Sequence, residues 1–164
     1  MPRTGKIPKR QIEADPIYQS PLVSKLINKL MYSGKKSISQ KAVYGAFDII
    51  RAKGQDPIPT FEKALDNITP KMEVKPRRVG GASYMVPTEV RGPRRQSLAI
   101  TWLITAARSR SAKEVEKTKN LPPIAAKLAI ELIEASQGTG KAVGKREEMH
   151  RAAEANKAFS HFRW

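Results

Sequence analysis

Apolar side chains recur at every third or fourth position along most of this 164-residue chain, which is the spacing of one helix face. The first such segment follows Ser20-Pro21, a pair typical of a helix start, and ends at Gly34, a common terminator. The same signals predict six helices, at about residues 20–33, 39–53, 56–69, 92–108, 122–137 and 145–159. We therefore expect a mainly α fold built as a six-helix bundle.

One stretch interrupts the helical pattern. Residues 72–90, MEVKPRRVGGASYMVPTEV, are rich in the β-branched and aromatic types that suit a strand. Their central Gly80-Gly81 pair supplies the positive φ angles of a tight hairpin turn. Pro76 and Pro87 stand in opposite arms, and neither can donate to a ladder in the middle of a larger sheet. The sequence thus predicts a two-stranded β-ribbon that protrudes between the third and fourth helices.

Charge points to the kind of partner. The chain has 31 Lys and Arg against 15 Asp and Glu, and its formal net charge of +16 is spread along the sequence. A basic globular domain most often binds a polyanion, of which nucleic acid is the commonest. There is no run of about 20 apolar residues that could form a membrane span, and no apolar stretch follows the polar N-terminus as a secretory signal would require. The absence of cysteine fits a reducing compartment.

Several clusters of cations are candidate phosphate contacts. Arg91, Arg94 and Arg95 flank the start of the fourth helix, where cations oppose the helix dipole and therefore indicate an external anion. A second cluster follows the first helix, where the dipole alone favours cations, so a purely structural role stays open. Its members are Asn28, Lys29, Lys35 and Lys36. The ribbon adds Lys75, Arg77 and Arg78, although an ordinary hairpin with a solvated charged face is the alternative. The extended tail adds Arg3, Lys6, Lys9 and Arg10.

Catalytic and metal-binding motifs are missing. Segment 138–146 is not a Walker A loop, because Thr139 replaces the first glycine and Arg146 replaces the magnesium-binding hydroxyl. His150 and His161 lack both cysteine partners and the i, i+4 spacing of zinc ligands. Carboxylates near the end of the chain are interleaved with cations, and we expect them on solvated faces. They are Glu131, Glu134, Glu147, Glu148 and Glu154. The sequence predicts no metal, no cofactor and no enzymatic activity.

Three long segments carry a family likeness: the ribbon EVKPRRVGGASYMVPTEV, the following RRQSLAITWLITAARSR, and the ending AVGKREEMHRAAEANKAFSHFRW. Together they closely resemble the bacterial-type small-subunit ribosomal protein seven. The segment INKLMYSGKK is similar to the same family, and the likeness runs in order over about residues 18–164. Two departures are a loop at 109–121 that looks longer than usual, and Gly144 where a lysine is common.

The resemblance implies one helical RNA-binding domain at residues 18–164, with the ribbon at 72–90 as an arm, preceded by a basic extended arm at 1–17. It implies a structural constituent of the small ribosomal subunit, in the cytoplasm or in an organelle, that binds the 3′ major domain of the ribosomal RNA and nucleates head assembly. It also implies that the ribbon lines the tRNA exit site and the messenger exit channel, beside ribosomal proteins eleven and nine.

Carried over position by position, the resemblance adds further RNA contacts to the clusters above. They are Arg108, Lys145, Arg146, His161, Arg163 and Trp164. It assigns the ribbon tip to the tRNA exit site. The tip comprises Val79, Gly80, Gly81, Ala82, Ser83 and Tyr84. A free-standing regulator of messenger RNA or DNA stays open as a rival, because a protein shaped for ribosomal RNA can also bind a mimic of it. A nuclease is disfavoured, since no acid–base or metal constellation is present.

Overall fold

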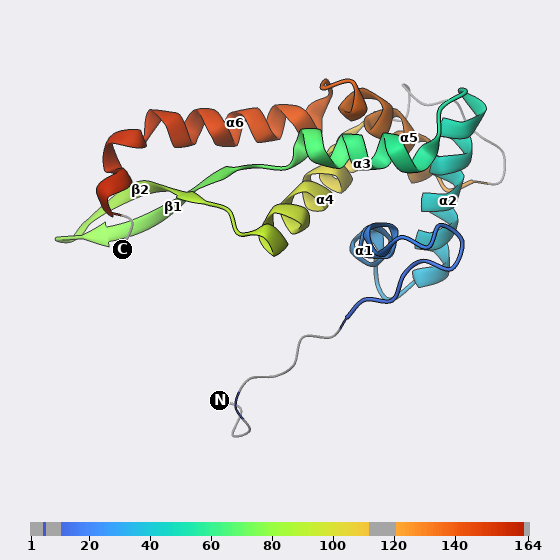
Figure 1. Cartoon of the computed structure of the whole chain (residues 1–164), viewed down its shortest axis with the longest axis horizontal. Coiled ribbons are helices and arrows are strands. Elements are labelled where there is room, and N and C mark those ends of the chain that lie inside the picture. The colour runs from blue at the N-terminus through green and yellow to red at the C-terminus, as the bar shows by residue number, and fades with distance from the viewer. Residues whose placement is uncertain (1–4, 6–10, 112–120, 163–164) are drawn as a thin grey trace.

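The computed structural model describes residues 5, 11–111 and 121–162. The described part contains α1 (Pro21–Leu30), α2 (Lys36–Ala52), α3 (Pro57–Ile68), β1 (Met72–Val79), β2 (Ala82–Glu89), α4 (Gly92–Ser109), α5 (Pro123–Ser136), α6 (Lys141–Ala155) and the 3-10 helix η2 (Lys157–Phe162). The two strands extend away from the helical body, and α6 runs alongside them (Figure 1). The predicted mainly α fold, with a ribbon between the third and fourth helices, is confirmed. No described helix is long and apolar enough to span a membrane.

Proline marks the start of α1, α3, α4 and α5, each of which has it within the first two positions. The missing N–H of proline costs nothing there, because the first N–H groups of a helix have no partner within the helix. The predicted starts of these four helices are therefore confirmed. The glycines that follow helices also act as expected: Gly54, with φ +78°, ends the turn after α2.

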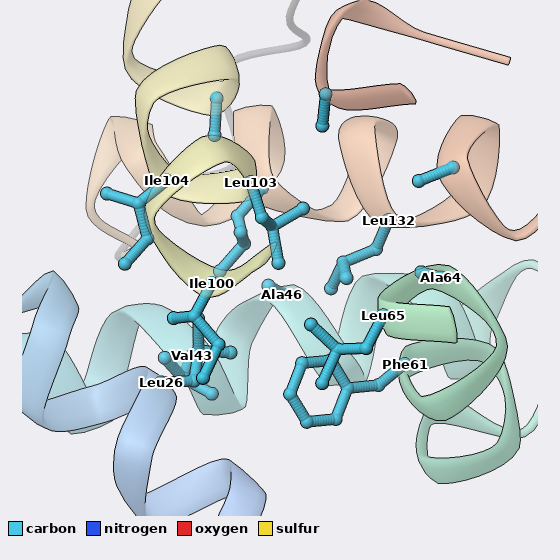
Figure 2. Packing of buried hydrophobic residues seen from close by; sticks show 14 of the residues in the cluster. Leu26, Val43, Ala46, Phe61, Ala64, Leu65, Ile100, Leu103, Ile104 and Leu132 are labelled. Carbon is cyan, nitrogen blue, oxygen red and sulfur yellow. The ribbon is translucent and has the colours of Figure 1, made fainter. Parts of the chain in front are cut away.

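The core lies where α5 packs against α2, α3 and α4. Leu128 and Leu132 on α5 are fully buried, and Ala129 between them lets the neighbouring helices approach closely. Figure 2 shows Leu132 among side chains contributed by the other helices, including Phe61 and Leu103. Because this core is built from helices that flank the ribbon on both sides in sequence, it fixes the direction in which the ribbon leaves the body.

The ribbon is an antiparallel pair in which Val79 is opposite Ala82 and Met72 is opposite Glu89. Gly80 and Gly81 form its two-residue turn with φ of +58° and +89°, a left-handed geometry that glycine adopts without strain. The predicted glycine turn is confirmed. Val86 and Val90 are buried at the root, whereas most of the outer half is exposed. The ribbon is thus anchored by its root and reaches outward.

Predicted boundaries were wrong for three helices, of which α1 ends at Leu30 rather than near residue 33. α2 begins at Lys36 rather than near Ser39, because Gly34 (φ +73°) reverses the chain directly before it. Ser39 does not cap its own helix, since its hydroxyl donates to the carbonyl of Ile27, 2.7 Å away. α6 begins at Lys141 rather than near residue 145, and its α-helical part ends at Ala155, before η2.

The prediction that Glu131 lies on a solvated face was also wrong, because its side chain is fully buried. One carboxylate oxygen accepts the backbone N–H of Ala142 at 2.8 Å, which stabilises the first turn of α6. The other accepts Nε of Arg110 at 2.7 Å, and Arg110 also bonds Glu134. Burial alone would lower the pKa of the Arg110 guanidinium, but the bonds to Glu134 and Glu131 outweigh it and raise the pKa. This cluster explains why α6 starts earlier than expected.

Candidate nucleic-acid interface

Two stretches of the chain contain no acidic residue: residues 16–47 and residues 90–111. They form α1, the turn after it, the first part of α2, and α4, and α1 packs against both α2 and α4. We call these stretches together the basic face. Its exposed cations are Lys29, Lys35, Lys36, Lys41, Arg91, Arg94 and Arg108. Lys41 was not predicted as a site residue, although the lack of carboxylates around it in the sequence could have indicated it.

The ammonium of Lys29 is hydrogen-bonded to other residues of the protein. Its ammonium donates to the carbonyl and hydroxyl of Ser97, at 3.0 and 2.8 Å, and to the hydroxyl of Thr101 at 2.7 Å. An ammonium has three donors, so these bonds can use all of them. Asn28 lies beside it, where both residues help to line a groove of about 570 Å³ between α1 and the start of α4. Lys29 therefore joins α1 to α4, and a phosphate would have to compete for it.

Arg94 and Arg95 also find carboxylates inside the chain. Nε of Arg94 lies 2.7 Å from Glu73, and Arg95 lies 2.6 Å from Glu89. Lys75 is 2.9 Å from the other oxygen of Glu73. Burial alone would raise the pKa of Glu73, but the hydrogen bonds from Lys75 and Arg94 outweigh it and lower the pKa. The cations at the start of α4 thus tie the ribbon root to the helix, while Arg94 keeps half of its side chain exposed.

Other predicted contacts lie at helix ends. The Arg108 guanidinium donates to the carbonyl of Leu30 at 3.0 Å, at the end of α1. The Arg146 guanidinium donates to the carbonyl of Asn67 at 2.6 Å, near the end of α3. Both arginines satisfy carbonyls that a helix end leaves without a partner. Lys145 forms an exposed ion pair with Glu148 at 2.7 Å. The two arginines join separate helices, and contact of all three cations with RNA stays a prediction.

The remaining predicted cations of the described part are exposed, and none has a side-chain partner there. They are Lys35, Lys36, Arg77, Arg78 and Arg91. Lys35 and Lys36 lie at the turn between α1 and α2, Arg91 lies at the ribbon root, and the other two lie in the outer half of β1. The fold therefore brings free positive charge to the basic face and to the ribbon. Arg3, Lys6, Lys9, Arg10, Arg163 and Trp164 lie outside the described residues.

Tyr84 does not lie free at the ribbon tip. Its ring centroid is 5.2 Å from that of Phe159 and 5.4 Å from that of Phe162, both on η2. Aromatic pairs at this separation attract one another beyond the area they bury. The 3-10 helix η2 therefore packs against β2, beside which Figure 1 draws it. His161 is exposed and lies between these two phenylalanines in sequence, with Nδ1 2.9 Å from the carbonyl oxygen of Ala158. The small residues 79–83 form the free tip.

His150 holds the ribbon root against α6. The backbone N–H of Lys71, just before β1, donates to Nε2 of His150 at 3.0 Å, so the ring accepts through Nε2 and is neutral. Burial lowers the pKa of His150, and the positive charges of Arg146 and Lys71 lower it further.

This bond makes ribbon docking sensitive to pH. Because the folded-state pKa is lowered, the unfolded chain binds more protons in this range. The contribution of His150 to stability is fully present above the ordinary histidine pKa of about 6.5, and it is lost as pH falls toward the pKa of the folded state. Protonation of Nε2 removes the acceptor of the bond from Lys71, and such a hydrogen bond contributes about 1 kcal/mol to the free energy of unfolding. Urea unfolding between pH 7.5 and 5.5 should show this loss, and His150→Gln should flatten it, while His161→Gln, the matched control, should not. Equal pH dependence in all three proteins would contradict this role.

Known proteins are similar to this chain over its whole length. The family profile described as "Ribosomal protein S7p/S5e" matches residues 2–157. The chain belongs to this family. Two proteins named "Small ribosomal subunit protein uS7", from Caldanaerobacter subterraneus subsp. tengcongensis and Carboxydothermus hydrogenoformans, are 55% and 54% identical to it over 165 residues, with 100% of each chain covered. A third, from Acetivibrio thermocellus, is 54% identical with the same coverage.

Family membership confirms the resemblance on which the sequence interpretation rested. Proteins of this family are structural, non-enzymatic components of the ribosome, so the prediction that the chain is not an enzyme is confirmed.

Proposed function

We propose that this protein binds the 3′ major domain of the small-subunit ribosomal RNA through its basic face and ribbon, and thereby nucleates assembly of the subunit head. The observation that supports the proposal most strongly is that two acid-free stretches, far apart in sequence, pack together in α1, α2 and α4. A surface whose own helices carry many cations and no carboxylates attracts a polyanion.

The mechanism is placement. Lysines and arginines on different helices neutralise phosphates from several RNA segments and release the counterions condensed on them, which supplies affinity. The packed core between α2, α3, α4 and α5 keeps these cations at fixed distances from one another. RNA segments bound at the same time are then held in one relative arrangement. Fixing this arrangement is how a structural protein promotes assembly of a subunit.

The ribbon has a separate task in this proposal. It reaches away from the body, its outer half is exposed, and its tip is small and uncharged. Such a tip adds little electrostatic affinity but can fit closely against a partner. Together with the family resemblance, this supports a position at the tRNA exit site and the messenger exit channel, with ribosomal proteins eleven and nine as neighbours.

Replacing Lys35 and Lys36 by alanine should weaken binding to a transcript of the 3′ major domain. Both are exposed and unpaired in the described part, so each is free to neutralise a phosphate. The slope of log K against log salt should become shallower by about two units, because each phosphate contact contributes about 0.9. Binding isotherms at several salt concentrations measure this slope.

The matched control replaces Lys53 and Lys63, two exposed lysines that lie outside the basic face. This variant removes the same charge and should retain the slope of the unaltered protein. Equal slopes for both double variants would show that affinity follows net charge alone, and the proposed interface would be wrong.

A further inference from the structure

A hollow of about 300 Å³ opens on the basic face beside the turn that joins α1 to α2. We call it the α1–α2 groove. It is bounded by the end of α1, the first turns of α2, the end of α4 and the start of α5. The residues that line it are Leu30, Tyr32, Lys35, Ile38, Ser39, Ala42, Arg108 and Ile124. Most of them are apolar, which sets the groove apart from the charged surface around it.

Two large apolar side chains that line the groove are exposed to solvent. Tyr32 is 78% exposed and Ile38 is 53% exposed. The backbone of Tyr32 is fixed, because its carbonyl accepts the N–H of Lys35 at 3.1 Å and the intervening Ser33 and Gly34 both have positive φ. The turn therefore presents an aromatic ring to solvent from a defined position. Isolated exposed apolar residues are ordinary, but two that border the same groove indicate a binding site.

The charges at the groove are both positive. Lys35 lies in the turn, and Arg108 is held at the edge by its bond to the carbonyl of Leu30 at 3.0 Å. A guanidinium has five N–H donors, so this bond leaves donors for a ligand. Among the residues that the structure describes, no carboxylate lines the groove. Its chemistry suits a ligand that combines a flat, apolar surface with an adjoining negative charge.

We propose that the α1–α2 groove binds an unpaired RNA base, which stacks on Tyr32 and packs against Ile38 while its neighbouring phosphates contact Lys35 and Arg108. The inference rests on the proposed RNA binding and adds a site for a single-stranded nucleotide to it. Proteins commonly hold unstacked RNA bases on aromatic side chains in this way. An acidic peptide would also satisfy the two cations. The RNA is favoured because exposed cations continue beyond the groove along the first part of α2, at Lys36 and Lys41, as a chain of phosphates requires.

The test measures binding of a transcript of the 3′ major domain to the full chain and to three variants. Tyr32→Ala should weaken binding about 5- to 100-fold, the effect of losing one base–aromatic stack. Its salt slope should stay unchanged, because no phosphate contact is removed. Tyr32→Phe keeps the ring and should bind as the unaltered protein does. Ile17→Ala removes another exposed apolar side chain, 63% exposed, and serves as the matched control.

Crosslinking identifies the occupant. With a transcript that contains 4-thiouridine, the expected product joins the peptide that carries Tyr32 to a nucleotide in an unpaired segment. Undiminished affinity of Tyr32→Ala would overturn the groove proposal alone, and it is the result expected if the groove takes a peptide instead. Failure of the unaltered protein to bind the transcript would overturn the proposed function and this inference together. Since Tyr32 is exposed, melting curves of its variants should match that of the unaltered protein.

Discussion

Glu131→Ala is expected to destabilise the fold by about 3–5 kcal/mol, the usual cost of removing one partner from a buried ion pair. Glu131 is fully buried, and Arg110, only 8% exposed, would lose its bond to this carboxylate while remaining out of water with the partly exposed Glu134. The backbone N–H of Ala142 at the start of α6 would lose its acceptor as well. A domain of this size is stable by about 5–15 kcal/mol, so the loss is a large fraction of the total.

Urea unfolding at pH 7 measures the effect. Glu148→Ala is the matched control: its ion pair with Lys145 is exposed and should contribute little to stability. Replacing both members of the buried pair, as Glu131→Leu with Arg110→Met, should cost less than Glu131→Ala, because no buried guanidinium is then left with one of its two carboxylates missing. A loss below about 1 kcal/mol for Glu131→Ala would mean that water reaches Arg110 and that the cluster does not hold α6.

The sequence could not reveal this cluster. Glu131 and Glu134 sit three residues apart on an otherwise apolar helix, and the same spacing is usual for solvated surface pairs. What buries Glu131 is Arg110, which comes from beyond the end of α4, and the start of α6, where Gly140 with φ +94° brings the backbone close to the carboxylate. These contacts depend on how three helices meet, and periodicity along one helix carries no information about that.

Local signals, in contrast, were enough to predict most of the architecture. The prolines at helix starts and the Gly80-Gly81 turn act within a few residues of themselves, so the sequence already contains what determines them. The apolar stripes of α2 and α5 were likewise readable, because each buries the face that its own spacing defines. The errors at the end of α1 and at the starts of α2 and α6 fall where the contacts at the boundary include distant residues.

The candidate site was predictable only as a set of charges. The sequence interpretation named Lys29, Arg94 and Arg108 as RNA contacts beside Lys35 and Arg77, but the fold gives the first three partners inside the protein. Which cations are free depends on the carboxylates and carbonyls that the packed helices bring near them. The acid-free character of residues 16–47 and 90–111 was visible in the sequence, whereas their contact through α1 and α4 required the structure.

Shortening the ribbon is expected to alter tRNA handling while leaving RNA anchoring nearly intact. The variant replaces residues 78–83 by Asn-Gly between Arg77 and Tyr84, which are opposite one another in the native register. It removes two residue pairs and inserts a new turn, so every remaining side chain keeps its face of the ribbon. At about 3.4 Å per residue, the ribbon loses roughly 7 Å of reach. The contacts of Tyr84 with Phe159 and Phe162 lie outside the replaced piece.

The root and the basic face are untouched in this variant. Glu73 with Arg94, and the bond from Lys71 to His150, lie at the opposite end of the strands from the turn. The replacement removes a single cation, Arg78, so the salt slope for ribosomal RNA binding should fall by at most about one unit. Particle yield should therefore stay close to that of the unaltered strain.

Decoding should respond because the lost tip is the part that the proposed function places at the tRNA exit site. We expect altered tRNA retention or reading-frame maintenance, measured in the same strain as particle yield. Arg78→Ala is the matched control, since it removes the charge without shortening the ribbon, and it should leave frame maintenance unchanged. If head assembly collapses in the shortened variant while decoding by the surviving particles stays normal, the ribbon is an assembly device and the exit-site assignment is wrong.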